Sequence, residues 1–255
     1  MPDLEHQLRN RVAGGGKLFL PYVTGGLPGV DEALLRELER SGADAVEVGV
    51  PFSDPVMDGP VIQEASRRAL EGDATANGVI DLVARAGLSI PVVVMTYLNP
   101  VLAPGPERFL DAARESGVAG VIVPDLPVDE GAEWREACSS RDIASVFLAA
   151  PGSSRKRLRQ VAAATRGFVY CVAAYGVTGE RASLGSTARE VVDGLRPLTS
   201  IPLVVGVGIG TPAAANAACQ FADGVVVGSA LVRPLLDGDP GRTVQLGKEF
   251  RAAIS

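Results

Sequence analysis

Short apolar segments rich in β-branched residues alternate with longer amphipathic segments along most of the chain. A short, nearly unbroken apolar run is typical of a parallel strand that is buried on both faces. The pattern therefore predicts strands at Leu18–Thr24, Ala45–Val48, Pro91–Met95, Val118–Val123, Ala144–Leu148, Phe168–Val172, Leu203–Val205 and Gly224–Val227.

The amphipathic segments predict helices between these strands. In residues 30–41, for example, Leu34, Leu35 and Leu38 are separated by charged residues, which is the pattern of a helix with one buried face. The predicted helices are Asp3–Val12, Val30–Ser41, Glu107–Ser116, Glu130–Ser139, Arg155–Ala164, Ala188–Arg196, Thr211–Gln220 and Arg242–Ala253.

Alternating strands and helices indicate βαβ units and a parallel sheet. About eight such units in 255 residues favour a closed barrel over an open, doubly wound sheet, because a (β/α)₈ barrel typically needs about 250 residues. We therefore expect residues 1–255 to form a single α/β domain, a (β/α)₈ TIM barrel with an extra N-terminal helix.

Two long connections follow the C-terminal ends of predicted strands, which is the catalytic face of such a barrel. They are Gly49–Pro60 and Ala173–Ser186. The second exceeds the usual βα connection of about 2–6 residues, and it contains several glycines. We expect it to be a mobile lid over the cavity.

Glu47 interrupts an apolar strand, and a carboxylate buried there is costly unless it is paired or used. Because buried acids cluster at functional sites, this position indicates a functional acid more than a structural one. Asp58 lies in the following loop, close enough to face the same cavity, although an Asp before Gly59 also suits a simple turn. Asp54, before Pro55, fits a turn better.

Glycine clusters end the last three predicted strands, at residues 176–179, 206–210 and 228. Glycines let backbone N–H groups approach an anion, and Ser229 could begin a short helix over 229–235 whose N-terminus points at a phosphate. A phosphate site after the seventh and eighth strands is common in these barrels. The alternative is that these glycines only allow tight turns between strand and helix. A dinucleotide fingerprint is disfavoured because Gly208-x-Gly210 lies near the chain's end.

Composition and charge narrow the partners. The net charge is −6 and no basic stripe is present, which argues against nucleic acid. No apolar run reaches the ~18 residues that a membrane span needs, and the charged N-terminus does not suit a signal peptide. Cys138, Cys171 and Cys219 are widely spaced and odd in number, so they suit a reducing compartment, and we expect a cytoplasmic protein.

The scarcity of basic catalytic groups limits the chemistry. The single histidine, His6, lies in the leading helix, which argues against an imidazole metal site and against a histidine base. None of the three lysines, Lys17, Lys156 and Lys248, follows a strand, which disfavours a Schiff-base aldolase. Acid–base work must fall to Glu, Asp or Tyr.

The segment GADAVEVGVPFSDPVMDGPVIQ around Glu47 and Asp58 resembles the signature of the tryptophan synthase α family. Supporting segments are LPYVTGGLPG, YLNPVL, VPDLPVDE, YGVTG, VGVGIGTP and VVVGSALV, so the resemblance covers essentially the whole chain. It implies retro-aldol cleavage of indole-3-glycerol phosphate to indole and glyceraldehyde 3-phosphate, in tryptophan biosynthesis.

The resemblance also implies roles for residues. Glu47 would be the acid–base group, Asp58 would bind the indole N–H, and Tyr170 would line the site. The implied phosphate-binding positions are Gly179, Gly208, Gly228 and Ser229, and the pocket would include Tyr22, Phe52, Leu98 and Thr178. Two departures concern affinity rather than the reaction: Tyr22 stands where Phe is usual, and Ala174-Tyr175 replaces a more polar pair.

The family works in an α2β2 complex with a pyridoxal-phosphate β subunit that consumes the indole. We therefore expect a β subunit as partner and no cofactor or metal in this chain. Two alternatives stay open: a free-standing indole-3-glycerol phosphate lyase serving secondary metabolism, and an inactive barrel that only activates a partner. The presence of both Glu47 and Asp58 argues against the inactive barrel.

Overall fold

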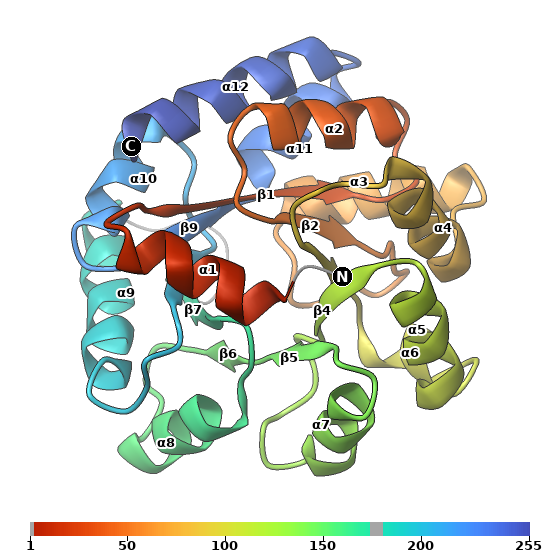
Figure 1. Cartoon of the computed structure of the whole chain (residues 1–255). Helices are drawn as coiled ribbons and strands as arrows, with labels where there is room; N and C mark the ends of the chain where they lie inside the picture. The colour runs from red at the N-terminus through yellow and green to blue at the C-terminus, as the bar shows by residue number, and fades with distance from the viewer. Residues whose placement is uncertain (1–2, 174–180) are drawn as a thin grey trace.

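The strands form one parallel sheet that curves into a barrel surrounded by helices (Figure 1). The computed structural model describes residues 3–173 and 181–255, with only the backbone described over 181–186. The strand order is β5-β4-β3-β2-β1-β9-β8-β7-β6. The strands are β1 Leu18–Thr24, β2 Val46–Gly49, β3 Val92–Met95, β4 Val118–Ile122, β5 Ala144–Val146, β6 Leu148–Ala149, β7 Val169–Val172, β8 Leu203–Gly206 and β9 Gly224–Val227.

The predicted TIM barrel is confirmed, but one predicted strand is divided. The segment expected as a single strand over 144–148 forms β5 and β6, which are separated by Phe147. β5 pairs with β4 and β6 pairs with β7, so this segment lies at both ends of the sheet and closes it. The carbonyl oxygen of Phe147 accepts a hydrogen bond of 3.2 Å from the Tyr170 N–H at the junction.

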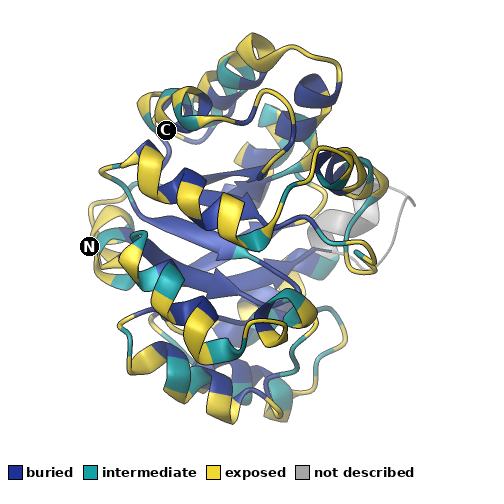
Figure 2. Cartoon of the chain, turned by 90° about the vertical axis from the view of Figure 1, so that its right-hand side faces the viewer, coloured by how far each residue is buried: buried dark blue, intermediate teal, exposed yellow. Residues whose placement is uncertain are grey.

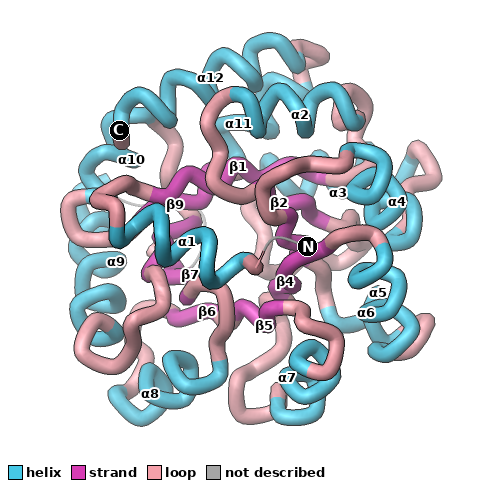
Figure 3. The backbone as a smooth tube through the Cα atoms, in the orientation of Figure 1, coloured by secondary structure: helices cyan, strands magenta, loops and turns pink. Residues whose placement is uncertain are grey.

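Helices cover the outside of the barrel, and Figure 3 shows them as a ring around the strands. Three were not predicted: α3, α4 and the short α5. The helices are α1 Leu4–Ala13, α2 Glu32–Arg40, α3 Pro60–Glu71, α4 Ala76–Ala86, α5 Leu98–Leu102, α6 Pro106–Glu115, α7 Ala132–Ser139, α8 Arg155–Ala164, α9 Arg181–Leu195, α10 Pro212–Cys219, α11 Ser229–Leu236 and α12 Pro240–Ala253.

The predicted lid loop over 173–186 was too long. α9 begins at Arg181, so the last six residues of the expected loop are helical. Good helix formers at this point, such as Ala182 and Leu184, favour that outcome. The remaining candidate lid segment, 174–180, lies outside the described residues.

Burial follows the layers of the barrel. Most of the sheet is dark blue in Figure 2, while the helices are blue inward and yellow outward. The N-terminal helix α1 covers the end of the barrel where the strands begin, because a Cβ added at Gly120 or Gly167 would lie within 3 Å of the Leu4 side chain. At the other end of the barrel, where the strands finish, the βα loops follow the strands. Among the described residues no helix is long and apolar enough to cross a membrane.

A part-buried ion pair connects the last helix to the first strands. The Oδ2 atom of Asp44, before β2, accepts from the Phe19 N–H at 2.8 Å and from Arg251 Nη1 of α12 at 3.0 Å. The same Nη1 donates to the Lys17 carbonyl at 2.9 Å, and Arg11 Nε lies 3.4 Å from Asp44 Oδ1. Burial raises the pKa of Asp44 and lowers the pKa of Arg251, and the attraction between the two charges acts against both shifts.

Arg251→Met should lower the free energy of unfolding by about 2 kcal/mol, since it removes the closer of the two arginines that pair with the part-buried Asp44 carboxylate and leaves only Arg11. The side chains of this pair are only 12% and 15% exposed. Arg242→Met is a matched control in the same helix: its pair with Glu249 is 46% and 37% exposed, and it should cost less than about 1 kcal/mol. Urea denaturation of both variants measures the difference, and equal losses would contradict the assigned role of the pair.

Candidate active site

Glu47 lies on β2 inside the barrel and is 1% exposed. Its Oε2 has no hydrogen-bond partner among the described residues, and its register partner on β1 is Tyr22. Burial, with a smaller contribution from the charge of Asp58, raises the pKa of Glu47 to about 8. At neutral pH the side chain is therefore mostly a neutral carboxylic acid that can donate a proton into the cavity.

Asp58 lies in the loop after β2, at the end of the barrel where the strands finish. Burial raises its pKa to about 6, and a hydrogen bond from the Tyr97 hydroxyl acts in the opposite direction. The hydroxyl donates to Oδ2 at 3.1 Å. Asp58 is therefore mostly ionised at neutral pH. Because the pKa values of these two neighbouring carboxyl groups differ, one of them, Glu47, can act as an acid while the other, Asp58, acts as an anion.

Tyr97 was not predicted as a site residue. It immediately precedes α5, is almost completely buried, and accepts a hydrogen bond of 3.0 Å from the Met57 N–H. The Phe52 ring stacks on it, with ring centroids 5.0 Å apart and planes 27° apart. The sequence did contain a signal for this residue. Acid–base work in this barrel is limited to Glu, Asp and Tyr, and Tyr97 lies just beyond the C-terminal end of a strand. Leu98, which was predicted, is half-buried at the start of α5.

Tyr22 on β1 and Tyr170 on β7 are buried inside the barrel near the same two carboxyl groups. Burial raises the pKa of both tyrosines well above the usual value, and the charges of Asp58 and Glu47 raise both further. Each ring lies over a glycine of a neighbouring strand. A Cβ at Gly49 would lie 2.1 Å from the Tyr22 hydroxyl, and one at Gly206 would lie 2.2 Å from the Tyr170 hydroxyl. These two glycines therefore leave the space that the rings occupy.

The predicted phosphate positions after β8 and β9 lie on exposed backbone. Gly208 has a φ of 86° next to Val207, which has a φ of 67°. Gly228 precedes α11, and the N–H groups of Ser229 and Ala230 at the helix start form no hydrogen bond with any described residue. A Cβ at Gly228 would lie 3.6 Å from the Tyr22 ring, which places this backbone beside the cavity.

Two predicted residues, Thr178 and Gly179, fall in the segment outside the described residues. The other predicted positions all lie on segments at the end of the barrel where the strands finish. Within the described part of the chain, no group of three or more His, Cys, Asp or Glu side chains could hold a metal ion.

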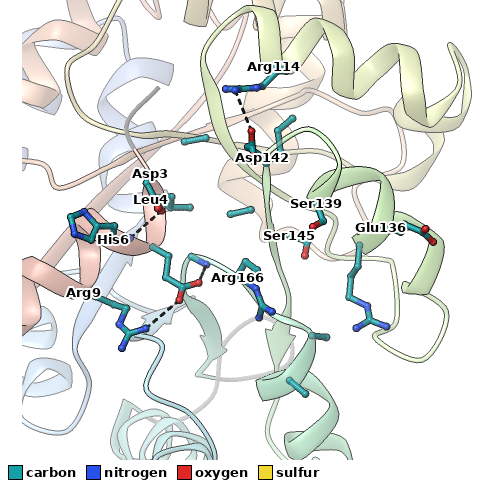
Figure 4. A pocket seen from close by; sticks show the side chains of 18 of the residues that line it. Asp3, Leu4, His6, Arg9, Arg114, Glu136, Ser139, Asp142, Ser145 and Arg166 are labelled. Carbon is teal, nitrogen blue, oxygen red and sulfur yellow. Dashed lines mark hydrogen bonds and ion pairs between the residues drawn. The ribbon is translucent and has the colours of Figure 1, made fainter.

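A separate cavity of about 1140 Å³ lies at the opposite end of the barrel, between α1, α7 and the start of β5 (Figure 4). Its arginines are interspersed with acids: Arg9 pairs with Glu5 at 3.4 Å and Arg114 with Asp142 at 3.5 Å. None of the predicted site residues lines it. In this fold that end contributes to stability rather than to chemistry, so we place the site around Glu47.

Comparisons with known proteins agree on one family. The family model described as tryptophan synthase alpha chain matches residues 8–250. A tryptophan synthase alpha chain of Halalkalibacterium halodurans is 43% identical over 89% of this chain and 87% of its own length. One of Streptomyces avermitilis is 45% identical over 89% of this chain and 83% of its own length.

Solved structures give the same result. Tryptophan synthase of M. tuberculosis in an aminoacrylate-bound form superposes with a TM-score of 0.89 and 34% identity, covering 100% of both chains. Tryptophan synthase subunit alpha of Legionella pneumophila gives a TM-score of 0.90 and 31% identity, over 100% of this chain and 98% of its own.

Tyr97→Phe should raise the pKa of Asp58 above about 6, because the hydroxyl donates to the ionised form and its loss favours the protonated form. A carboxyl ¹³C NMR titration of the free protein measures this value. Tyr170→Phe is the control: Tyr170 is also buried in the cavity but donates no described hydrogen bond to Asp58, so the pKa should stay near about 6. If the pKa of Asp58 were the same in both variants, Tyr97 would have no role in setting it.

Proposed function

The chain belongs to the tryptophan synthase alpha chain family, and from this premise we propose how its residues carry out the reaction. The chain is a lyase of tryptophan biosynthesis that cleaves indole-3-glycerol phosphate to indole and glyceraldehyde 3-phosphate. The observation that supports our assignment is the pair of carboxyl groups, Glu47 buried and Asp58 part-buried, with pKa values of about 8 and about 6.

Glu47 moves the protons. As a neutral acid it donates its proton to C3 of the indole ring, which becomes an indolenium cation. The new carboxylate then takes the proton of the glycerol hydroxyl on the carbon attached to C3. The C–C bond breaks, its electron pair neutralises the cation, and the hydroxyl carbon becomes the aldehyde. Glu47 ends protonated, as it began, so no other proton carrier is needed.

Asp58 supplies the negative charge. Its ionised carboxylate lies near the indole N–H and stabilises the positive charge that develops on the ring nitrogen. The hydrogen bond from Tyr97 orients this carboxylate, and Phe52 stacks on Tyr97 behind it. Tyr22, Tyr170 and Leu98 form walls for the ring.

The phosphate is bound by backbone. The N–H groups of Ser229 and Ala230, which have no partner within the described part of the chain, lie at the start of α11 and favour an anion. Gly208 and Gly228 permit close approach at the ends of β8 and β9. We assign Gly179 to the same phosphate site and Thr178 to the lid that closes over the substrate.

A β subunit is the partner that we propose, in an α2β2 complex, with pyridoxal phosphate held by that subunit and not by this chain. Exposed apolar side chains on the loop after β2 and at the end of α5 support a docking surface there: Val56 is 79% exposed, Leu102 52% and Met57 47%. A cytoplasmic location fits the free state of all three buried cysteines. No observation favours a free-standing lyase.

Glu47→Gln should lower indole release by the isolated chain by about 10²-fold or more, because the amide keeps the shape and loses the transferable proton. Substrate binding should change little. Asp54→Asn is the control, since Asp54 is exposed in the same loop, and it should keep most of the activity. If Asp54→Asn loses more than Glu47→Gln, the roles are wrongly assigned.

The pH profile of kcat/KM should be bell-shaped, with limbs near pH 6 and pH 8. Activity falls below the lower limb because Asp58 becomes protonated and loses its charge. It falls above the upper limb because Glu47 loses the proton that it donates. In Asp58→Asn, the residual activity should lack the acid limb and keep the alkaline one. Survival of the acid limb in that variant would show that another group causes it.

A further inference from the structure

A carboxylate outside the cavity holds the backbone beside Tyr97. Asp125, in the loop after β4, accepts from the Leu98 N–H with both oxygens, at 2.9 Å to Oδ1 and 3.2 Å to Oδ2. Leu98 is the first residue of α5, and Tyr97 before it provides no side-chain cap. A carboxylate that accepts from a backbone N–H forms a stronger hydrogen bond than a neutral acceptor does. Asp125 therefore supplies the cap of this short helix.

This contact fixes Tyr97 from one side, and β4 fixes it from the other. The peptide group that joins Tyr97 to Leu98 is planar, so holding the Leu98 N–H also sets the backbone of Tyr97, whose ψ is 164°. On the preceding side, the Thr96 N–H donates to the Ile122 carbonyl of β4 at 3.0 Å. These two hydrogen bonds, one on each side, fix the backbone of Tyr97 and therefore the point from which its side chain extends.

The position of Tyr97 in turn determines the position of Asp58. The hydroxyl of Tyr97 donates to Asp58 Oδ2 at 3.1 Å while it accepts from the Met57 N–H at 3.0 Å. We propose that Asp125 is a positioning residue for the cleavage, acting through Tyr97 to keep the Asp58 carboxylate in place and ionised. The inference rests on the role proposed above for Asp58.

The side chain of Asp125 is exposed, so replacing it opens no cavity in the core. The titratable groups that face Asp58 in the cavity are Glu47 from β2, Tyr22 from β1, Tyr170 from β7 and Tyr97. All of them keep their identity when Asp125 is changed. The charge of Asp125 itself acts on Tyr97, but its removal would by itself lower the pKa of Asp58. A rise in that pKa would therefore report movement of Tyr97 or of Asp58.

The test combines NMR and kinetics on the full chain. Asp125→Ala should raise the pKa of Asp58, as Tyr97→Phe does, and should lower kcat by about tenfold to 10²-fold, the cost of a misplaced group, with KM less affected. Asp125→Asn keeps an oxygen that can accept from Leu98 and should retain most of the activity. Asp129→Ala is the matched control, because Asp129 lies in the same loop and pairs with Arg157 at the surface.

A double-mutant cycle separates positioning from general stabilisation. In the Tyr97→Phe background, Asp125→Ala should shift the pKa of Asp58 no further, because the path is already interrupted. Additive shifts, or an unchanged pKa in Asp125→Ala alone, would overturn the proposal. The pKa is measured in the free protein. Retained activity in Asp58→Asn would refute the proposed function separately, and it would leave the effect of Asp125 on that pKa intact.

Discussion

The chemistry of this barrel depends on the partial or complete removal of two neighbouring carboxyl groups from water. Burial disfavours the charged form of both, but only Asp58 has a described donor, the Tyr97 hydroxyl, to offset that cost. The Glu47 Oε2 has no partner among the described residues, and deeper burial together with the charge of Asp58 keeps Glu47 protonated. Burial depth and one hydrogen bond therefore separate an acid from an anion, and the backbone before the short helix α5 positions the tyrosine that forms this bond.

The strands were predictable because parallel strands buried on both faces leave a continuous apolar run in the sequence. β1 and β9 have the predicted bounds. The helices α3 and α4 were missed although their boundary signals were present: Pro60 begins α3, while Thr75 and Gly87 cap α4. The five residues of α5 are too few to show a helical period. The division at Phe147 depends on pairing with two distant strands, which no local pattern contains.

The candidate site was predictable where a residue conflicts with its local surroundings. A glutamate within an apolar strand is such a conflict, and Glu47 lies in the barrel as that conflict implied. Tyr97 creates no conflict in its segment, because an aromatic residue after a strand is ordinary. Its importance arises from a hydrogen bond to a residue 39 positions away. The same is true of Asp125, whose contact with Leu98 spans 27 positions.

The ion pair between Arg251 and Asp44 has a consequence for the order of folding. Its two members are 207 positions apart in the sequence, and β1 pairs with β9, which is almost as distant along the chain. Contacts of such long range cost loop-closure entropy before they stabilise anything. We therefore expect neighbouring βα units to associate first and the seam between β1 and β9 to form late.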